Sequence, residues 1–184
     1  HALVRRQRQM CIRDSTVGTG IGVGVVQNGS IVNGRSHPEI GHIRVERHPT
    51  DRTFSGTCPF HGDCLEGLAS GPAIAARWGA SLTELGQDHR GLVLEGFYLG
   101  QLALNLLLHH RPDVIIFGGG VSQTPGLIER IRHECLQLLG GYLPELASAD
   151  VMGALITSPR LENDAGILGA FMMAQRAFSR TSIS

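Results

Sequence analysis

Apolar residues recur on nearly every side of a helical projection across residues 91–110, the longest hydrophobic pattern in the chain. A helix that is apolar all round is typical of a protein core. We therefore predict a buried helix here, which ends at Arg111 because Pro112 cannot continue it. Residues 125–139 carry a narrower apolar stripe and predict an amphipathic helix.

Shorter helices are expected between residues 65 and 78. Leu65, Leu68 and Ile74 belong to an apolar set with the spacing of one helical face. The segment Ser70-Gly71-Pro72 interrupts this set, and a second helix is expected to begin at Pro72, since proline suits the first helical turn. Residues 164–178 predict a closing helix rich in small residues.

Short apolar runs predict the strands. Residues 16–26 read as the end of one strand, a glycine-rich turn and a second strand, and Asn28-Gly29 supplies the positive φ angles of a tight hairpin turn. Residues 114–117 form a continuous apolar run, as in a buried parallel strand. Residues 151–156 predict a further strand.

The composition limits the possible fold classes and binding partners. The chain has 184 residues, of which 42% are hydrophobic, 5% are aromatic and 25 are glycine, a mixture that suits an α/β protein with many tight turns. The formal net charge is zero, so we expect neither a nucleic acid nor an anionic membrane as partner. No apolar run approaches membrane-spanning length and no signal peptide is recognised. We therefore expect a cytoplasmic location, where cysteine–histidine clusters bind metal more often than they oxidise.

Residues 1–14 differ from the rest of the chain. This stretch, HALVRRQRQMCIRD, is basic and shows no periodic apolar face, so we interpret it as a foreign or disordered start. A basic arm that binds nucleic acid is the less favoured alternative, because no aromatic residues accompany the charges. Residues 15–180 are expected to form the domain, and residues 181–184 a frayed tail.

The stretch of the chain with the clearest chemistry runs from Cys58 to Glu66. Cys58, His61 and Cys64 stand at C-x-x-H-x-x-C spacing, and His42 lies upstream as a fourth donor. Zinc accepts thiolate and imidazole ligands in a closed tetrahedral shell. The spacing therefore predicts a structural zinc site built from these four residues.

Other interpretations of this stretch remain open from spacing alone. His37 and His48 are rival fourth ligands, because both flank the same loop. A Cys58–Cys64 disulfide is the weaker alternative, since nothing in the chain indicates secretion. Cysteines can also be buried simply as small hydrophobic residues.

Two glycine-rich segments are candidate phosphate sites. Gly18-Thr19-Gly20 joins two predicted strands, and residues 118–120 follow the predicted strand at 114–117. Backbone N–H groups in such turns can approach phosphate oxygens. For Gly18-Thr19-Gly20 alone, a plain tight turn is the simpler interpretation. For residues 118–120, phosphate binding and close packing against a sheet are equally compatible with the sequence.

Taken together, these motifs resemble the ROK family of repressors, open reading frames and sugar kinases. The resemblance rests on Glu39-x-Gly41-His42, the cysteine loop, and Cys64-x-Glu66, and it extends from residue 16 to about residue 177. The C-x-x-H-x-x-C loop and the segment LEGLASGPAI at residues 65–74 resemble the fructokinases within the family, rather than the C-x-C-G-x-x-G-C pattern of other members.

The resemblance implies a role for each motif. It implies a structural Zn²⁺ on the four ligands already named, and an ATP site that also uses Mg²⁺. The implied sugar-binding residues are Glu39, His42 and Glu66. The implied nucleotide-binding residues are Gly18, Thr19, Gly20, Pro72, Gly118, Gly119, Gly120, Val121 and Ser122.

It also implies a fold and an activity. The expected architecture is the actin-like ATPase, or ribonuclease-H-like, sugar-kinase fold, of which this chain is mainly the C-terminal lobe with an inserted zinc loop. The intact parent is expected to be a cytoplasmic homodimer that phosphorylates fructose to fructose 6-phosphate with ATP. No residue here matches the family's catalytic aspartate, so the chain alone is expected to be inactive.

Three alternatives are weighed against the fructokinase. The first is the sugar-sensing half of a ROK-family transcriptional repressor, and the second is a glucokinase or mannokinase of the same family. The third is a zinc-knuckle nucleic-acid binder, which the neutral charge and the lack of an aromatic platform disfavour.

Overall fold

The computed structural model of the chain describes residues 11–32, 34–161, 164, 167–172 and 174–175. These residues contain a five-stranded sheet in the order β3-β2-β1-β4-β5. β1 pairs antiparallel with β2 and parallel with β4, and β5 extends the sheet parallel to β4. The strands are β1 (Cys11–Val17), β2 (Ile21–Gln27), β3 (Ser30–Ile31), β4 (Val114–Gly118) and β5 (Ile156–Thr157).

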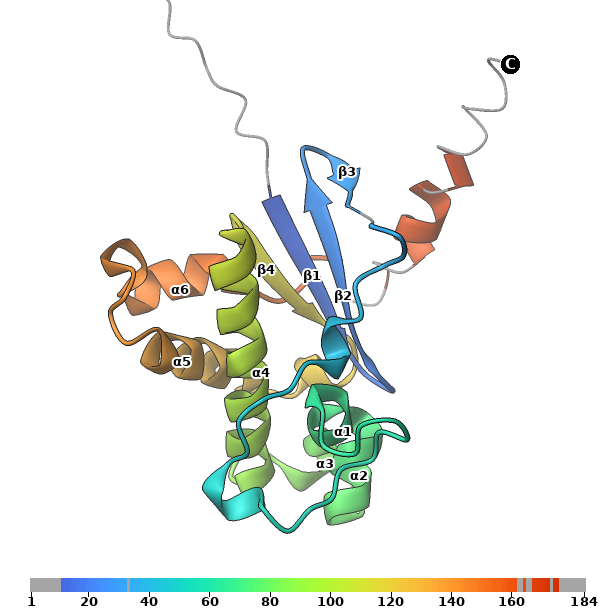
Figure 1. Cartoon of the computed structure of the whole chain (residues 1–184), viewed down its shortest axis with the longest axis vertical. Coiled ribbons are helices and arrows are strands. Elements are labelled where there is room, and N and C mark those ends of the chain that lie inside the picture. The colour runs from blue at the N-terminus through green and yellow to red at the C-terminus, as the bar shows by residue number, and fades with distance from the viewer. Residues whose placement is uncertain (1–10, 33, 162–163, 165–166, 173, 176–184) are drawn as a thin grey trace, which may run out of the picture.

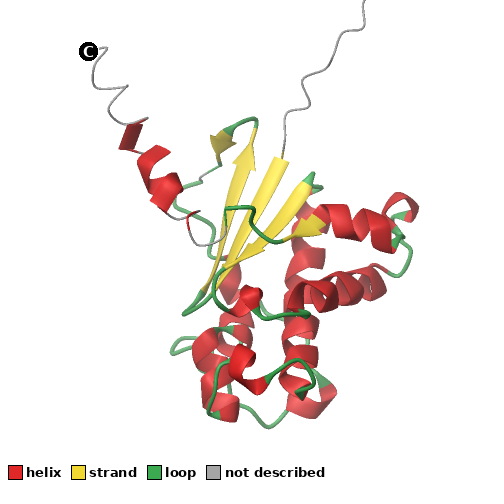
Figure 2. Ribbon diagram, turned by 180° about the vertical axis from the view of Figure 1, so that it is seen from behind, coloured by secondary structure: helices red, strands yellow, loops and turns green. Residues whose placement is uncertain are grey.

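Helices pack against one face of this sheet and continue beyond its lower end (Figure 1). Along β1 and β2 buried and exposed residues alternate, and Figure 2 shows the sheet face that α4 and α5 leave uncovered. The helices are α1 (Leu65–Ala69), α2 (Gly71–Trp78), α3 (Leu82–Leu85), α4 (Arg90–His110), α5 (Leu127–Leu139) and α6 (Ala149–Leu155). Short 3₁₀ turns are η1 (Ile40–His42), η2 (Pro49–Asp51), η3 (Val121–Gln123) and η4 (Pro144–Leu146).

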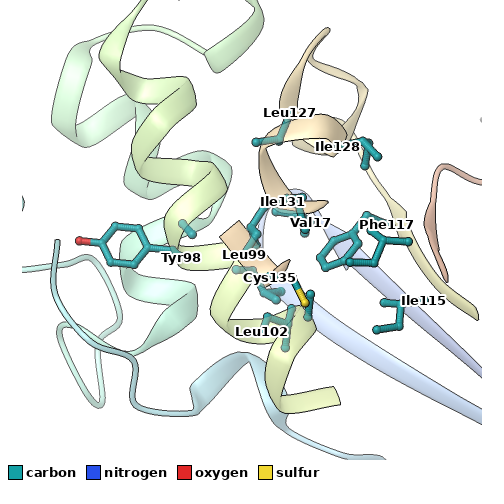
Figure 3. Close-up of a cluster of buried hydrophobic side chains, with 14 of the residues drawn as sticks. Val17, Tyr98, Leu99, Leu102, Ile115, Phe117, Leu127, Ile128, Ile131 and Cys135 are labelled. Atoms are coloured by element: carbon teal, nitrogen blue, oxygen red, sulfur yellow. The ribbon is translucent and has the colours of Figure 1, made fainter. Parts of the chain in front are cut away.

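The core lies where α4 and α5 meet the sheet. Leu99 and Leu102 of α4 face Ile131 and Cys135 of α5, with Phe117 of β4 beside them (Figure 3). All five side chains are fully buried. Because the two helices supply apolar side chains to one shared cluster, they and the sheet form a single hydrophobic core.

Two glycines on α4 allow α5 to approach closely. A Cβ at Gly96 would lie 2.6 Å from the Cβ of Arg130, and one at Gly100 would lie 2.5 Å from the Cβ of Glu134. These positions are four residues apart and therefore lie on the same face of the helix. The missing side chains let the helix backbones come together at this crossing.

Most predicted elements are confirmed. The helix predicted at residues 91–110 is α4, and the break at Ser70 separates α1 from α2 as expected. The hairpin turn has φ of 57° at Asn28 and 73° at Gly29, the conformation that favours this residue pair. Residues 167–172 are helical, in agreement with the predicted closing helix, whose remaining predicted part lies largely outside the described residues.

The strand predicted at residues 151–156 is wrong for most of its length. The structure has helix α6 up to Leu155, and strand β5 begins only at Ile156. Ser148 caps the helix by accepting a hydrogen bond from the N–H of Val151 (3.2 Å). Met152 and Leu155 are buried three residues apart on one helical face. A short apolar run is compatible with both the helical and the strand periodicity, and here the cap and the packing select the helix.

The first described residues also differ from expectation. Residues 1–14 were expected to lie outside the domain, but Cys11–Val17 forms a central strand that pairs with a neighbour on each side. Arg13 is buried in this strand. Backbone pairing from both neighbours overrides the unfavourable side-chain pattern, since strand propensity depends strongly on context. Residues 1–10 and 181–184 lie outside the described residues.

The expectation that no apolar run approaches membrane length also needs correction. In the part of the chain that the structure describes, α4 is long and apolar enough to cross a bilayer by length and composition. However, 72% of its most apolar window is buried inside the protein. The core packing described above accounts for its hydropathy.

Candidate functional site

The cysteine loop folds into a narrow knuckle. The N–H of Gly62 donates to the carbonyl of Cys58 at 2.9 Å, and the N–H of Cys58 donates back to Gly62 at 3.2 Å. Gly62 has a φ of +64°, which glycine adopts without strain. A Cβ at Gly67 would lie 1.9 Å from the Gly62 carbonyl, so the knuckle packs directly onto α1. This geometry turns both thiols toward η1, which carries His42.

The four predicted ligand residues converge. The Sγ of Cys58 lies 3.7 Å from the Nδ1 of His42 and 3.7 Å from the Nδ1 of His61. The Sγ of Cys64 lies 3.5 Å from the Nδ1 of His42, and all four donor atoms lie within 4.8 Å of one another. A tetrahedral zinc ion, with bonds of about 2.3 Å to sulfur and 2.05 Å to nitrogen, separates these atoms by about 3.6 Å. The residues present therefore fit a closed four-ligand metal site.

The rival ligands lie elsewhere. The Nε2 of His37 pairs with the carboxylate of Glu39 at 2.7 Å. The ring of His48 caps η2 by accepting a hydrogen bond from the N–H of Thr50 (3.2 Å). Cys58 and Cys64 are both free thiols, so the structure does not contain the alternative disulfide.

The two thiols have different electrostatic environments. Burial tends to raise the pKa of Cys58, but N–H groups of His61 and Phe60 and the neighbouring Cys64 and His61 side chains outweigh it and bring that pKa to about 6. Burial, together with the Cys58 side chain, raises the pKa of Cys64. A thiol whose pKa is lowered is available as thiolate at neutral pH, which is the form that binds metal.

The carboxylate of Glu66 lies between the cluster and the first glycine turn. Its Oε2 accepts a hydrogen bond from the N–H of Ile21 at 2.8 Å, and its Oε1 lies 3.9 Å from the Nε2 of His42. The His42 and Glu66 side chains are each 27% exposed, so solvent-borne ligands can reach both. Glu39, the third predicted sugar ligand, is more exposed and pairs with His37 instead.

The predicted nucleotide segments also come together. The N–H of Gly71, at the start of α2, donates to the carbonyl of Gly18 at 2.7 Å. A Cβ at Gly71 would lie 3.8 Å from the Cγ2 of Val121. Gly119 has a φ of +89°, and a Cβ there would lie 2.4 Å from the carbonyl of Val17. Thus the turn after β1, the turn after β4 and the start of α2, where Pro72 stands, form one cluster of backbone.

Two predicted positions in this cluster carry hydroxyl groups. Thr19 is exposed at the tip of the first turn. Ser122 is buried in η3, and its Oγ has no hydrogen-bond partner within the described structure. At Gly119, close packing against β1 explains the need for glycine. This was one of the two interpretations of residues 118–120. Gly18 and Gly120 have open space at the Cβ position, so packing does not require glycine there.

A buried polar network supports the loop between His42 and Cys58, and sequence reasoning missed it. Asp51 of η2 accepts two hydrogen bonds from Arg77 of α2, at 3.0 and 3.1 Å, and one from the hydroxyl of Tyr98 of α4 at 2.7 Å. Burial and the neighbouring Asp51 raise the pKa of Tyr98 to about 12. The partners are 26 and 47 residues from Asp51, and no local pattern marks such pairs.

Comparisons with known proteins identify the family of this chain. The model of the ROK family matches residues 5–177. A fructokinase of Zymomonas mobilis is 40% identical over 88% of this chain and 53% of its own length. A fructokinase of Streptococcus mutans is 39% identical over 90% of this chain and 56% of its own length. A ROK-family glucokinase of Streptomyces griseus, solved with glucose and AMPPNP, superposes with a TM-score of 0.64 at 23% identity, over 92% of this chain and 62% of that one.

The sheet and its helices therefore have a fold of the actin-like ATPase class. The chain belongs to the ROK family. It spans about half the length of the fructokinases it matches. Both the predicted fold class and the resemblance to the ROK family are confirmed.

Proposed function

We propose that this chain is the part of an ATP-dependent fructokinase that carries the sugar-side acids, the metal loop and part of the nucleotide cradle. The observation that carries the proposal is the position of Glu66, between His42 of the ligand cluster and the turn formed by residues 18–20. In the intact parent, the γ-phosphoryl group of MgATP would pass to a hydroxyl of fructose and give fructose 6-phosphate. The two fructokinase relatives at 39–40% identity support this choice of sugar.

The metal in this proposal is a structural Zn²⁺. His42, Cys58, His61 and Cys64 would hold it, and four protein ligands leave no open position for a reacting group. Bound zinc supplies the cross-link that fixes the knuckle against η1. Its ligand His42 presents the second ring nitrogen toward Glu66, so the ion orients a residue of the sugar site without contacting sugar.

The sugar would bind at Glu66, His42 and Glu39. A carboxylate accepts hydrogen bonds from hydroxyl groups, and an imidazole that uses Nδ1 for metal can donate from Nε2. A pocket of polar groups matched to particular hydroxyls discriminates strongly between sugars, because a wrong sugar leaves buried groups unpaired. Glu39 would exchange its pairing with His37 for a sugar hydroxyl.

The nucleotide would bind at the backbone cluster described above. Its residues are Gly18, Thr19, Gly20, Pro72, Gly118, Gly119, Gly120, Val121 and Ser122. Backbone N–H groups in glycine-rich turns favour anions. AMPPNP in the Streptomyces griseus glucokinase supports an adenine nucleotide, and MgATP is the natural form of that ligand for phosphoryl transfer.

The chain by itself is expected to be inactive. Phosphoryl transfer needs a group that accepts the proton of the attacking hydroxyl. The resemblance implies that this group is an aspartate, in a region of the family's kinases that this chain does not cover. We further expect the intact parent to be a cytoplasmic homodimer.

The test is a chimera. This chain is joined to the part of the Streptococcus mutans fructokinase that it does not cover, and phosphorylation of fructose, mannose and glucose is measured with ATP. Preference for fructose supports the proposal, and the same assay on the 184-residue chain should give no product. A folded chimera that prefers glucose or mannose would contradict the choice of fructose and favour a glucokinase or mannokinase. Sugar binding without phosphorylation of any of the three would favour the repressor.

A further inference from the structure

Glu66 makes a backbone contact that sugar binding does not require. Its Oε2 accepts the N–H of Ile21 at 2.8 Å, and Ile21 directly follows the turn Gly18-Thr19-Gly20. The two residues are 45 positions apart in the chain. A Cβ at Gly20 would lie 2.7 Å from the same Oε2, so the turn and the carboxylate are in direct contact.

The other oxygen of the same carboxylate points to the metal cluster. Oε1 lies 3.9 Å from the Nε2 of His42, whose Nδ1 lies 3.5 Å from the Sγ of Cys64. A continuous path therefore runs from the thiols through the imidazole and the carboxylate to the backbone of the turn. The side chains at both steps of this path are only partly exposed, so solvent screens them incompletely.

Metal binding would change the contact between His42 and Glu66, in the middle of this path. An imidazole that gives Nδ1 to a metal carries its proton on Nε2, and this N–H commonly donates to a carboxylate. A movement of about 1 Å would bring the His42 Nε2–H to hydrogen-bond distance from Oε1. The carboxylate would then be held between two donors, the ring of His42 and the N–H of Ile21.

We infer that Glu66 is a positioning residue through which the metal at His42 and the cysteines orders the turn Gly18-Thr19-Gly20. The inference rests on the proposed metal site and deepens it, because it assigns the ion an effect on the nucleotide side as well as on the loop. Coupling between two sites is reciprocal. If zinc steadies the turn, breaking the contact at the turn must weaken zinc binding by the same factor.

Glu66 is not the only residue that restrains the turn. The N–H of Gly71 also holds the carbonyl of Gly18, at 2.7 Å. This contact belongs to α2 and does not involve the ligand cluster. It anchors the Gly18 end of the turn whether or not metal is bound, whereas the Ile21 end contacts Glu66, which lies beside His42.

The experiment measures the exchange of the Ile21 amide proton by NMR in the full chain, with zinc and with a chelator. Removal of a carboxylate that supports a metal ligand typically lowers metal affinity about ten-fold or more. Because the coupling is reciprocal, we expect zinc to slow the exchange of the Ile21 amide by the same factor, about ten-fold. In Glu66→Ala the slowing should disappear, while zinc still protects the amides of residues 58–64. Glu66→Gln keeps one acceptor oxygen and should restore part of the effect.

A second variant breaks the contact without removing the acid. Gly20→Ala places a methyl group against Oε2 and displaces it from the Ile21 N–H. We expect zinc affinity, measured by competition with a chromophoric chelator, to fall about ten-fold in this variant and in Glu66→Ala. Gly22→Ala is the matched control on β2, because a Cβ there meets nothing within 4 Å, and its zinc affinity should be unchanged.

The outcomes separate this inference from the proposed function. Zinc that binds with unaltered affinity in Gly20→Ala and Glu66→Ala, or that leaves the Ile21 amide unaffected in the unmodified chain, overturns the coupling and leaves the metal site standing. Failure of the unmodified chain to bind zinc overturns both.

Discussion

Burial in α4 opposes the ionisation of Glu95. It lies on α4 with no exposed surface, and neither carboxylate oxygen has a hydrogen-bond partner in the described structure. The nearest cation is Arg77, whose Nη1 is 3.9 Å away, and Asp51 already neutralises that charge. Burial raises the pKa of Glu95 well above its ordinary value of 4.5, Arg77 only partly opposes this, and Asp51 adds to it.

This raised pKa makes stability depend on pH. Below pH 4.5 Glu95 is protonated in both states and has no effect. Above it the unfolded chain loses the proton while the folded chain keeps it, so unfolding becomes easier by about 1.4 kcal/mol per pH unit until the folded pKa is reached. Glu95→Gln should remove this loss, so its stability relative to the parent should increase as the pH rises above 4.5.

The measurement is urea unfolding at each pH. Glu129→Gln, a change at a largely exposed carboxyl of α5, is the control and should leave the pH dependence as it is. A constant difference between Glu95→Gln and the parent as the pH rises above 4.5 would contradict a neutral Glu95.

Arg13 is a second buried ionisable residue with few hydrogen-bond partners. It is 2% exposed in the central strand, its Nε lacks a partner, and one Nη donates only to the adjacent carbonyl of Ile12. Arg13→Met keeps a long flexible side chain and removes the charge, so we expect the free energy of unfolding to rise by about 1–3 kcal/mol, the usual cost of an unsatisfied buried group.

The matched substitution is Thr16→Val on the exposed side of the same strand. It should change the free energy of unfolding by less than about 0.5 kcal/mol. A loss of stability in Arg13→Met, measured by denaturant unfolding, would show that the buried guanidinium has a role its visible contacts do not explain.

At the scale of the elements, the crossing of α4 and α5 determines how the core closes. Gly96 and Gly100 lie against Arg130 and Glu134 with no room for a Cβ. Alanine favours a helix over glycine by up to about 1 kcal/mol when nothing else changes. At this crossing the steric conflict reverses that preference, since side-chain and backbone atoms of α5 occupy the space.

Gly100→Ala should therefore lower the free energy of unfolding, by about 1–3 kcal/mol, the usual cost of overpacking. Gly153→Ala in α6 is the opposite case, because a Cβ there meets nothing within 4 Å. It should raise the free energy of unfolding by about 0.5–1 kcal/mol. Equal effects of the two substitutions in thermal or urea unfolding would refute the close crossing.

On the scale of the whole molecule, the proposed metal site would tie a long irregular segment to the rest of the protein. Between η1 and α1 the described structure has one 3₁₀ turn, η2, and otherwise loops and turns. The contacts of Asp51 with Arg77 and Tyr98 hold this segment, as do two hydrogen bonds between Glu46 and Gln101 of α4. The ligand cluster lies at its two ends. A metal that binds the folded but not the unfolded chain stabilises the fold by about 2.7 kcal/mol when its concentration is 100 times its dissociation constant.

Removal of zinc with a chelator should consequently lower the melting temperature by about 5–10 °C. His61→Ala should abolish the response to zinc, because it removes one of the four ligands. His37→Ala should keep the response, since this rival ligand pairs with Glu39 outside the cluster. Calorimetry with and without the ion measures the shift. A full response in His61→Ala would remove this residue from the ligand set.

The sequence predicted the features that depend on spacing along the chain. The apolar periodicity identified α4, Asn28-Gly29 identified the hairpin, and the interval from Cys58 to Cys64 identified three candidate ligands in one loop. Such features are local, because helix geometry, turn conformation and loop closure depend on residues a few positions apart. The spacing proposed His42 as the fourth candidate ligand but left His37 and His48 open, and of these three only His42 lies in the cluster.

Only the tertiary structure decided the contacts between distant segments. These include the central place of β1 despite Arg13, the helix α6 in place of a strand, the Asp51 network and the bond from Glu66 to Ile21. For β1, backbone pairing with two neighbouring strands outweighs a weak local preference. The contacts of Asp51 and Glu66 join residues tens of positions apart, which no local pattern marks. The sequence thus determined which groups are available for chemistry, and the packing of helices on the sheet determined which of them meet.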